Sequence, residues 1–299
     1  NMDQTMWNTL QGNFFELSRR NMTLSRFSIH ADLILVALTP LYILWNDVRM
    51  LLVIQSALIA LGALPTFLLA QNVLKSRSIS LTLAAVYLLN PWMQWINMYD
   101  FHGVAVAITF RLFAFYCAYV KQWKLFTLFV VLSLLSKESV ALNIAILGLI
   151  VAVVFKEKKI GLLTFLISIL WFIGTVFYII PYFSQSLALD QHWAFKWYQF
   201  GSETEEGSLG VQIPTLKIII ERFFLAPDAI PYYYNLLRPF AFLPLLGFPW
   251  LILASPTLTI NMLSSHAQMR GMMLHYNSGI ISALVISTIF GLLYLKRIF

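Results

Sequence analysis

Long apolar runs separated by short polar segments make up most of the chain. A helix rises about 1.5 Å per residue, so roughly 20 apolar residues are needed to cross a bilayer core about 30 Å thick. The pattern therefore predicts membrane-spanning helices rather than the core of a water-soluble domain. The predicted spans are 50–74, 79–98, 104–120, 140–155, 160–183 and 279–295.

Other apolar segments are too short or too interrupted for an ordinary span. Residues 2–15 carry apolar side chains at helical spacing, which indicates an amphipathic helix lying in the interface. Residues 33–45 contain a proline and predict a re-entrant or interfacial helix. The run 125–135 predicts either a thin crossing of the membrane or a helix that continues past Lys137 and Glu138 into the next segment. Two proline-interrupted runs, 240–250 and 251–263, predict a segment that enters the membrane and returns.

Together these elements predict an all-α fold, a polytopic transmembrane helix bundle with short, broken and re-entrant helices and external loops. No internal repeat divides the chain, so we expect a single transmembrane domain. The opening residues do not form a signal pattern, and we expect an earlier span upstream. The expected parts are an external loop with interfacial helices at 1–49, transmembrane helices at 50–183, an external loop at 184–235, and C-terminal transmembrane helices at 236–299. The loop at 184–235 contains an acidic Gly/Ser patch at 201–210, and its pattern predicts an amphipathic helix at about 215–224.

The composition supports an integral membrane protein. Hydrophobic residues make up 60% of the chain and charged residues only 11%, whereas about a quarter of a soluble domain is charged. The net charge of +7 would suggest nucleic acid in a soluble protein. Here the charge is explained by its division between two membrane faces, so no nucleic-acid partner is predicted. The single cysteine, Cys117, excludes an intrachain disulfide, and the oligomeric state stays open.

The basic residues between the spans are predicted to share one membrane face. If each run crosses once, nine of them fall on the same side, and the positive-inside rule makes that side cytoplasmic. Every acidic residue except Glu157, and all five histidines, then face outside. We therefore expect a multi-pass protein of the cell membrane with its functional face outside the cytoplasm. The nine basic residues are Lys75, Arg77, Lys121, Lys124, Lys156, Lys158, Lys159, Lys296 and Arg297.

A polar turn at 97–102 joins two of the predicted spans. It contains Asp100 and His102, followed by a glycine that permits a tight turn. In one interpretation this is a solvated loop in which Asp100 caps the next helix. In the other, the carboxylate acts as a base or binds a cation, beside an imidazole that hydrogen-bonds a substrate.

Three further charged residues interrupt apolar sequence. Ionisable groups at membrane depth cost roughly 2.5–3.5 kcal/mol each, so they normally face a cavity or one another. Lys137 and Glu138 are either a mutual ion pair at a helix break, or a phosphate-binding lysine beside a catalytic or structural glutamate. Arg111 lies roughly 10 Å inside its span at about 1.5 Å per residue. It fits a structural ion pair or contact with a lipid phosphate.

Two polar clusters precede apolar segments on the predicted external face. Arg26 and His30 stand before the short run at 33–45, and Arg270 with the pair His275-Tyr276 stands before the last span. Interfacial arginine and tyrosine often serve only as membrane anchors. With the other acids and bases of this face, however, they form a rim that suits an anionic substrate whose tail lies in the bilayer.

Five ordered motifs resemble the DUF2079 family of predicted polytopic membrane proteins over nearly the whole chain. That family is grouped with the GT-C glycosyltransferases. The resemblance therefore implies a GT-C-like fold and transfer of a hexose or pentose from a polyprenyl-phosphate donor at the outer face. The motifs are Met2-Asp3-Gln4-Thr5-Met6-Trp7-Asn8-Thr9-Leu10-Gln11-Gly12, Phe27-Ser28-Ile29-His30, Tyr99-Asp100-Phe101-His102, Ser136-Lys137-Glu138-Ser139-Val140-Ala141-Leu142 and His275-Tyr276.

The resemblance also implies the position of the catalytic acid. GT-C enzymes carry it in the first external loop, which in this chain points to Asp3 or to an acid just upstream. Two residues depart from the family pattern. Val104 stands where an acid is frequent, and Ser139 replaces a frequent aspartate. Both departures remove a carboxylate from the expected site.

We therefore expect a glycosyltransferase site on the external face. Asp3, or an acid upstream, would deprotonate the acceptor hydroxyl, and Asp100 and Glu138 are further candidate catalytic acids. A divalent cation such as Mg or Mn would be held, if present, by the carboxylates and imidazoles of the rim. The expected substrate-binding residues are Lys137, Arg111 and Arg270 for the phosphate, and Arg26, His30, His102, His275 and Tyr276 around it.

Two other classes of function remain open from sequence. A transporter or lipid flippase would use the same buried charges to line a pathway. It predicts inverted repeats and polar residues that continue to the cytoplasmic side, and the sequence contains few of the latter. The second of these classes is a non-catalytic membrane scaffold.

Overall fold

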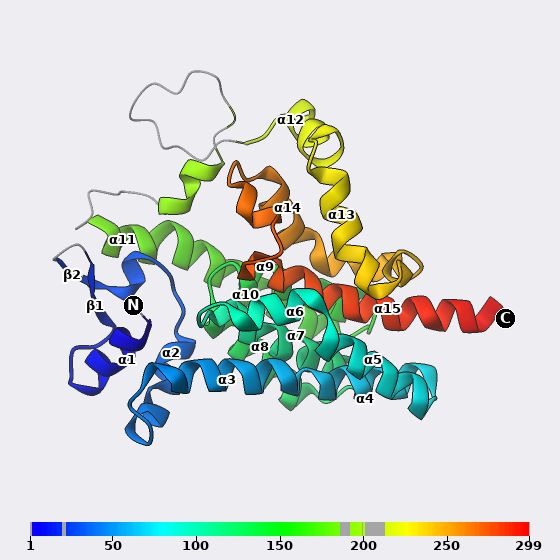
Figure 1. Cartoon of the computed structure of the whole chain (residues 1–299), viewed down its shortest axis with the longest axis horizontal. Helices are drawn as coiled ribbons and strands as arrows, with labels where there is room; N and C mark the ends of the chain where they lie inside the picture. Colours follow the sequence, from blue (N-terminus) through cyan, green and yellow to red (C-terminus); the bar gives the residue numbers. More distant parts are fainter. Residues whose placement is uncertain (1, 20–21, 186–191, 199, 201–212, 299) are drawn as a thin grey trace.

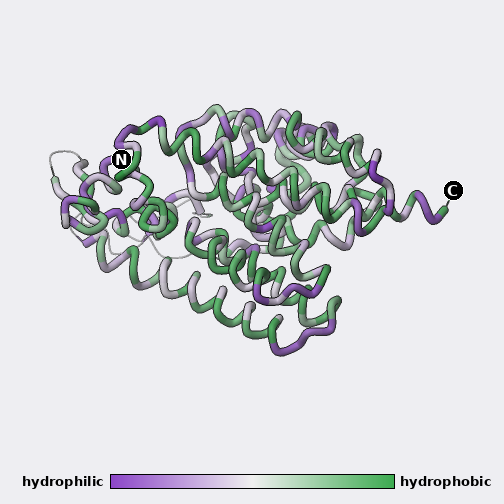
Figure 2. Tube along the Cα trace, turned by 90° about the horizontal axis from the view of Figure 1, so that it is seen from below, coloured by the Kyte–Doolittle hydropathy of each residue, from purple (hydrophilic) through white to green (hydrophobic). Residues whose placement is uncertain are grey.

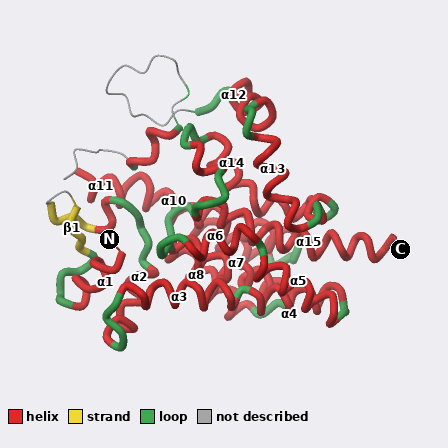
Figure 3. The backbone as a smooth tube through the Cα atoms, in the orientation of Figure 1, coloured by secondary structure: helices red, strands yellow, loops and turns green. Residues whose placement is uncertain are grey.

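The computed structural model describes residues 2–19, 22–185, 192–198, 200 and 213–298. Helices dominate it, with one short strand pair near the N-terminus (Figure 3). The predicted all-α membrane fold is confirmed. The acidic patch predicted at 201–210 lies outside the described residues.

The N-terminal segment contains a hairpin that the hydrophobic pattern did not predict. Helix α1 (Met2–Leu10) is followed by the antiparallel strands β1 (Glu16–Arg19) and β2 (Met22–Ser25). Leu17 and Leu24 are register partners, and both are buried against Ile29 and Trp193. This buried cross-strand pair stabilises the strands. Their polar composition had indicated only a polar connection.

The short run at 33–45 is helical but divided into two pieces, and its re-entrant or interfacial position stays a prediction. Helix α2 (Ile34–Leu38) passes directly into the 3-10 turn η2 (Thr39–Ile43), which contains the proline. Proline cannot donate a backbone hydrogen bond, which favours an irregular turn at this point. Upstream, the 3-10 turn η1 (Arg26–Ser28) connects the hairpin to this segment.

Three helical stretches of the described chain are long and apolar enough to cross a membrane. They are Val48–Leu74, Lys158–Ser184 and His275–Ile298. The first joins α3 (Val48–Leu61) to α4 (Ala63–Leu74), the second joins α10 (Lys158–Ile173), a π-helical turn η3 (Gly174–Ile179) and α11 (Ile180–Ser184), and the third joins η11 (His275–Asn277) to α15 (Ser278–Ile298).

Shorter apolar helices complete the bundle. The predicted runs at 104–120, 125–135 and 140–155 become separate helices, so the charged pair after 135 ends one helix before the next begins. They are α7 (Gly103–Tyr119), α8 (Trp123–Ser136) and α9 (Val140–Val153).

The predicted span at 79–98 is not one helix. It is divided into α5 (Arg77–Leu89) and α6 (Pro91–Met98) at Asn90. The Asn90 side chain accepts a hydrogen bond from the backbone N–H of Trp92 at 2.9 Å, which caps α6. An asparagine cap before proline starts a new helix instead of continuing the old one.

The region at 184–235, predicted as an external loop with one amphipathic helix at about 215–224, contains helix there and further helical segments in its described parts. Helix α13 (Ala229–Leu237) buries Tyr232 and Leu236 in the core, and Trp92 donates from its indole to the carbonyl of Asn235 at 2.9 Å. The other elements from here onward are η5 (Trp193–Trp197), α12 (Leu216–Ile220), η6 (Glu221–Leu225), η7 (Arg238–Phe240), η8 (Leu243–Leu245), η9 (Phe248–Ala254), α14 (Ser255–Leu263) and η10 (Ala267–Arg270).

Helices α7 and α15 form the centre of the bundle. The most apolar stretch of the span His275–Ile298 is 72% buried, against 33% for Val48–Leu74 and 28% for Lys158–Ser184. The outer helices therefore present apolar surface to lipid. Figure 2 shows hydrophobic residues along the helices and hydrophilic residues mainly at their ends.

The basic residues predicted to share a face gather at one end of the bundle, here called the basic end. Lys296 donates from its ammonium to the carbonyl of Leu74 at 2.9 Å, and Lys121 lies 3.5 Å from Glu157. In Figure 1 the end of α15 and the turn between α4 and α5 lie together, opposite α1. These helix ends therefore lie at the same end of the bundle. The cytoplasmic location of the basic end stays a prediction.

Small residues let α9 and α10 approach closely. A side chain at Gly161 would collide with the backbone of Gly148 and Ala152, whereas Gly174 has open space around it. We expect Gly161→Ala to destabilise the fold by about 1–3 kcal/mol, as is typical of overpacking. Thermal denaturation in detergent measures this. Gly174→Ala is the matched control, and equal melting temperatures for the two variants would contradict the packing argument.

Candidate functional site

A buried glutamine shapes the turn at 97–102. Gln55 of α3 is fully buried; its side-chain N–H donates to the carbonyl of Tyr99 at 3.3 Å, and its oxygen accepts from the backbone N–H of His102 at 2.8 Å. No side chain caps α7, so the capping role considered for Asp100 is wrong. The carboxylate of Asp100 is 73% exposed and lies 3.4 Å from Nδ1 of His102.

The break between α8 and α9 carries a carboxylate that is held by other segments. Glu138 is buried, with one oxygen 2.9 Å from Nδ1 of His30 and the other accepting from the backbone N–H of Ala31 at 3.1 Å. Nε2 of His192 lies 3.8 Å away. Of the two interpretations of Lys137 and Glu138, the mutual ion pair is wrong, because Glu138 contacts the two histidines and Ala31 instead.

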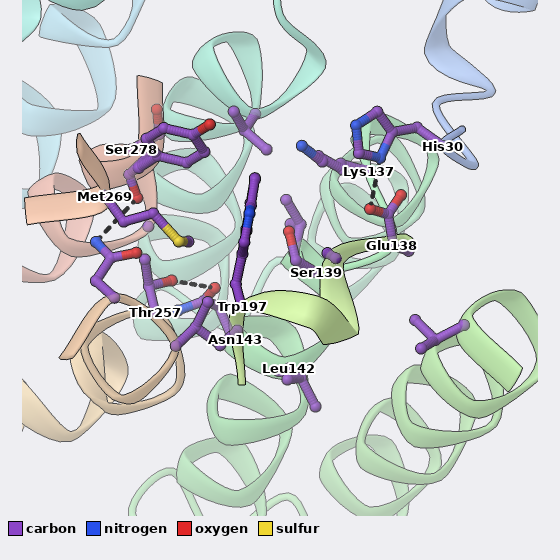
Figure 4. Close-up of a pocket in the computed structure, with 18 of the residues that line it drawn as sticks. His30, Lys137, Glu138, Ser139, Leu142, Asn143, Trp197, Thr257, Met269 and Ser278 are labelled. Carbon is purple, nitrogen blue, oxygen red and sulfur yellow. Dashed lines mark hydrogen bonds and ion pairs between the residues drawn. The ribbon is translucent and has the colours of Figure 1, made fainter. Parts of the chain in front are cut away.

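Lys137 has no hydrogen bond or ion pair with any residue in the described part of the chain. Its side chain lines a cavity, as shown in Figure 4, where it lies beside His30 and Glu138. Burial, partly opposed by the charge of Glu138, lowers the pKa of Lys137. A half-buried ammonium without a described partner is a candidate anion-binding group.

The hydrogen bonds define the tautomers of three histidines. An ionised carboxylate and a backbone carbonyl only accept, so Nδ1 of His30 donates to Glu138, and Nδ1 of His102 donates to the carbonyl of Asp100 at 2.9 Å. Nε2 of both rings then has a free lone pair when the ring is neutral. His192 has the opposite tautomer, because its Nδ1 accepts from the backbone N–H of Ala194 at 3.1 Å.

Burial and Lys137 keep two of these imidazoles neutral. Burial, followed by the charge of Lys137, lowers the pKa of His30 to about 4 in spite of its bond to Glu138. Burial also lowers the pKa of His102, with Lys137 contributing. For Glu138, burial alone would raise the pKa, but His30, His192 and Lys137 outweigh it and hold the pKa well below its usual value. The glutamate is thus ionised while the imidazoles beside it are neutral.

Two cavities meet at this cluster. Cavity 1 measures about 540 Å³ and cavity 2 about 460 Å³. His30, His102 and Trp193 line both and form the wall between them. The predicted site residues His30, His102, Arg111, Lys137, Glu138, His275 and Tyr276 line cavity 1, and Asp3, Arg26, His30, Asp100 and His102 line cavity 2.

Apolar and aromatic side chains form most of the remaining wall of cavity 1. Leu142, Phe172 and Ile260 contribute from α9, α10 and α14. Trp197 comes from η5, and in Figure 4 it stands between the wall of Lys137 and the wall of Met269 and Ser278. Such a cavity suits a ligand with one charged group and a large apolar part.

The three predicted arginines are engaged in different ways. Arg26 makes a buried two-pronged pair with Asp32, with a shortest contact of 2.6 Å; burial would lower its pKa, but Asp32 outweighs burial and raises it. Arg270 pairs with Asp228 at 2.6 Å and lines neither cavity. Arg111 donates to the carbonyl of Ser278 at 2.6 Å, and its Nε has no partner among the described residues.

Aromatic stacking orders the remaining predicted residues. The rings of His102 and His275 stack with centroids 3.7 Å apart, and Tyr99 stacks on His102 at 5.2 Å. Tyr276 lies against His275 with centroids 4.5 Å apart. The motifs at 97–102 and 275–276 therefore meet in one aromatic cluster beside Lys137.

One histidine and glutamate cluster has the composition of a metal site. In the described chain, ligand atoms of His30, Glu138 and His192 lie within 4.8 Å of one another. Both nitrogens that face the carboxylate carry protons, however, and the proton of His192 cannot move to Nδ1, which already accepts from Ala194. Mg and Mn also prefer oxygen ligands. The residues in this arrangement do not fit a divalent cation such as Mg or Mn.

The sequence pattern of a family described as "Predicted membrane protein (DUF2079)" matches residues 2–297. The chain belongs to the DUF2079 family. No curated protein and no solved structure matches it.

Three residues of the site in this DUF2079 protein were not singled out from sequence. His192 and Trp193 follow the predicted span 160–183, in a region predicted as a polar loop. The signal available in the sequence was an imidazole next to an indole. Gln55 lies within a predicted span. A glutamine at membrane depth needs partners, but the sequence does not show that they belong to the turn at 97–102.

The lowered pKa of His30 predicts a pH dependence of stability. The unfolded chain protonates this imidazole near pH 6.5, the folded protein only near pH 4. Between these values the unfolded state binds more protons, so stability falls as pH falls, by at most about 1.4 kcal/mol per pH unit. His30→Gln should flatten this fall in a thermal unfolding series over this range. His266→Gln, outside both cavities, is the control, and an unchanged slope in His30→Gln would contradict the prediction.

Proposed function

We propose that this protein is a glycosyltransferase that moves a sugar from a polyprenyl-phosphate donor to an acceptor hydroxyl at the outer face of the membrane. The observation that carries the proposal is the ammonium of Lys137, which faces a largely apolar and aromatic cavity without a described partner. A phosphate on a prenyl chain supplies both the anion and the apolar part that such a cavity requires. The family's grouping with the GT-C enzymes supports the same reaction.

Cavity 1 is the proposed donor site. Lys137 binds the phosphate, and the prenyl chain lies along the apolar side chains of Leu142, Phe172 and Ile260. The sugar lies toward the wall shared with cavity 2, where Trp193 offers an aromatic face. Leaving-group charge develops on the phosphate during transfer, so Lys137 stabilises the transition state as well as the bound donor.

Cavity 2 is the proposed acceptor site. Asp3 lines it, and one of its carboxylate oxygens is buried without a partner among the described residues. Asp100 borders the same cavity from a more exposed position. A hydroxyl group of the acceptor satisfies the free oxygen of Asp3, which orients the hydroxyl toward the shared wall.

Binding of polyprenyl phosphate to the protein in nanodiscs tests the donor site. A hydrogen bond to a charged group contributes about 1.5–3 kcal/mol, so Lys137→Met should weaken binding about ten- to hundredfold. Lys137→Arg should retain most of the affinity, because it keeps the charge.

Lys124→Met is the matched control, since it removes an exposed lysine at the basic end. Equal affinity of the two methionine variants would refute the phosphate site. Release of labelled sugar from polyprenyl-phosphate hexoses or pentoses then separates transfer from transport. Movement of intact donor across proteoliposomes without cleavage would identify a flippase instead.

The proposed sidedness is testable with single cysteines. Cys117 is buried and is the only cysteine of the chain, so Cys117→Ser provides a cysteine-free background. A membrane-impermeant maleimide added to intact cells should label Gln11→Cys, near the site, and not Ser78→Cys, at the basic end; both positions are exposed. The reverse pattern would place the site in the cytoplasm.

A further inference from the structure

The wall between the two cavities is where a transfer reaction has to occur. An acceptor hydroxyl from cavity 2 and a sugar from cavity 1 can meet only there. The group that takes the hydroxyl proton must reach that point within hydrogen-bond distance. Asp3 lines cavity 2 alone and Glu138 lines cavity 1 alone, whereas His30 and His102 line both.

His30 is oriented by a carboxylate that is itself fixed. Its Nδ1–H donates to one oxygen of Glu138 at 2.9 Å, and the other oxygen accepts from the backbone N–H of the next residue, Ala31, at 3.1 Å. The two hydrogen bonds fix the orientation of the imidazole ring relative to the carboxylate. In Figure 4 the ring nitrogen remote from Glu138 is directed toward the side on which the end of Lys137 lies. That nitrogen, Nε2, carries the free lone pair.

His102 fits the role less well. Its Nδ1 donates to a neutral backbone carbonyl, that of Asp100, which stabilises a positive imidazole less than a carboxylate does. One face of its ring is covered by His275, with centroids 3.7 Å apart. The two side chains are exposed to nearly the same extent, 16% for His30 and 17% for His102, so the carboxylate partner and the uncovered ring favour His30.

We propose that His30 is the catalytic base of this protein and that Glu138 is the positioning residue that orients it and stabilises its protonated form. This assignment rests on the proposed glycosyl transfer and names the residue that performs its proton transfer. It places the base at the shared wall rather than at Asp3, which binds the acceptor hydroxyl.

The reaction balances with the groups present. The acceptor oxygen forms a bond to the anomeric carbon of the sugar while its proton passes to Nε2 of His30. The bond from the anomeric carbon to the phosphate oxygen breaks, and its electron pair stays on the phosphate, next to Lys137. The products are a glycoside and a polyprenyl phosphate, and the imidazolium beside Glu138 returns its proton to water.

Donor binding also prepares the base. The charge of Lys137 is one cause of the low pKa of His30, after burial. A bound phosphate offsets that charge, so the imidazole becomes a stronger base when the donor is in place. The other charged or titratable groups around His30 include Glu138, Arg26, His192, His102 and His275, and, across cavity 2, Asp3 and Asp100.

The roles of His30 and Glu138 are tested by the pH dependence of sugar release. The substrate is a polyprenyl-phosphate hexose or pentose. His30→Gln should lower kcat by about 10²- to 10⁴-fold and remove the fall in rate at acid pH, while polyprenyl-phosphate binding changes little. Glu138→Gln should lower kcat and move that acid fall to lower pH, because the imidazolium loses its carboxylate. Added imidazole should restore part of the activity of His30→Ala, which a purely structural role would not allow.

His266→Phe is the matched control, since it removes the histidine that lines neither cavity and keeps an aromatic ring against Trp197. A His30→Gln variant with wild-type kcat and pH profile would overturn the proposal. If Asp3→Asn instead removed the acid fall, the base would be Asp3. Either result would concern the base alone. The proposed glycosyl transfer would still hold if polyprenyl phosphate bound and the binding depended on Lys137. Absence of sugar release by the wild type from every donor tested would overturn both.

Discussion

The buried carboxylate of Glu138 is the interaction on which the histidine-rich end of the molecule depends. Taking a charge out of water is costly unless several donors replace the lost hydration. Here they come from two other parts of the chain: the imidazole of His30 and the backbone N–H of Ala31 near the N-terminus, and Nε2 of His192, 3.8 Å away, in the segment after α11. The charge of the neighbouring Lys137 adds to their effect. Satisfying one carboxylate therefore draws three distant segments together.

The same requirement explains the break between α8 and α9. A continuous helix across Lys137 and Glu138 would present both charges along an apolar surface. Ending α8 at Ser136 and starting α9 at Val140 lets the two side chains face a cavity instead. Lys137 is left without a described partner there, next to imidazoles that burial keeps neutral. The result is a site with one fixed negative charge, one available positive charge and several neutral hydrogen-bonding rings.

Apolar packing positions this site but does not create it. Helices α7 and α15 are the most enclosed parts of the bundle, and α3 and α10 surround them with surfaces rich in exposed leucine and isoleucine, such as Leu166 and Leu170. Several polar side chains inside the bundle are matched by a partner, as Gln55 is by the backbone of the turn at 97–102. The packed helices thus place His102 and His275, which are far apart in the sequence, in contact.

The sequence by itself determined the class of the fold and the set of polar motifs. Length and period of the apolar runs depend on local composition, so most helices and the gathering of the basic residues followed from it. Asn90, with the proline after it, divided one expected span into two helices. An unexpected hairpin formed around the cross-strand pair Leu17 and Leu24. Both were local signals outweighed by the surrounding pattern. Only the tertiary structure decided which charges are neutralised: it paired Arg26 and Arg270 with aspartates, gave Glu138 to His30, and left Lys137 facing a cavity. Such partnerships depend on distances between residues far apart in the chain, which composition and spacing do not contain.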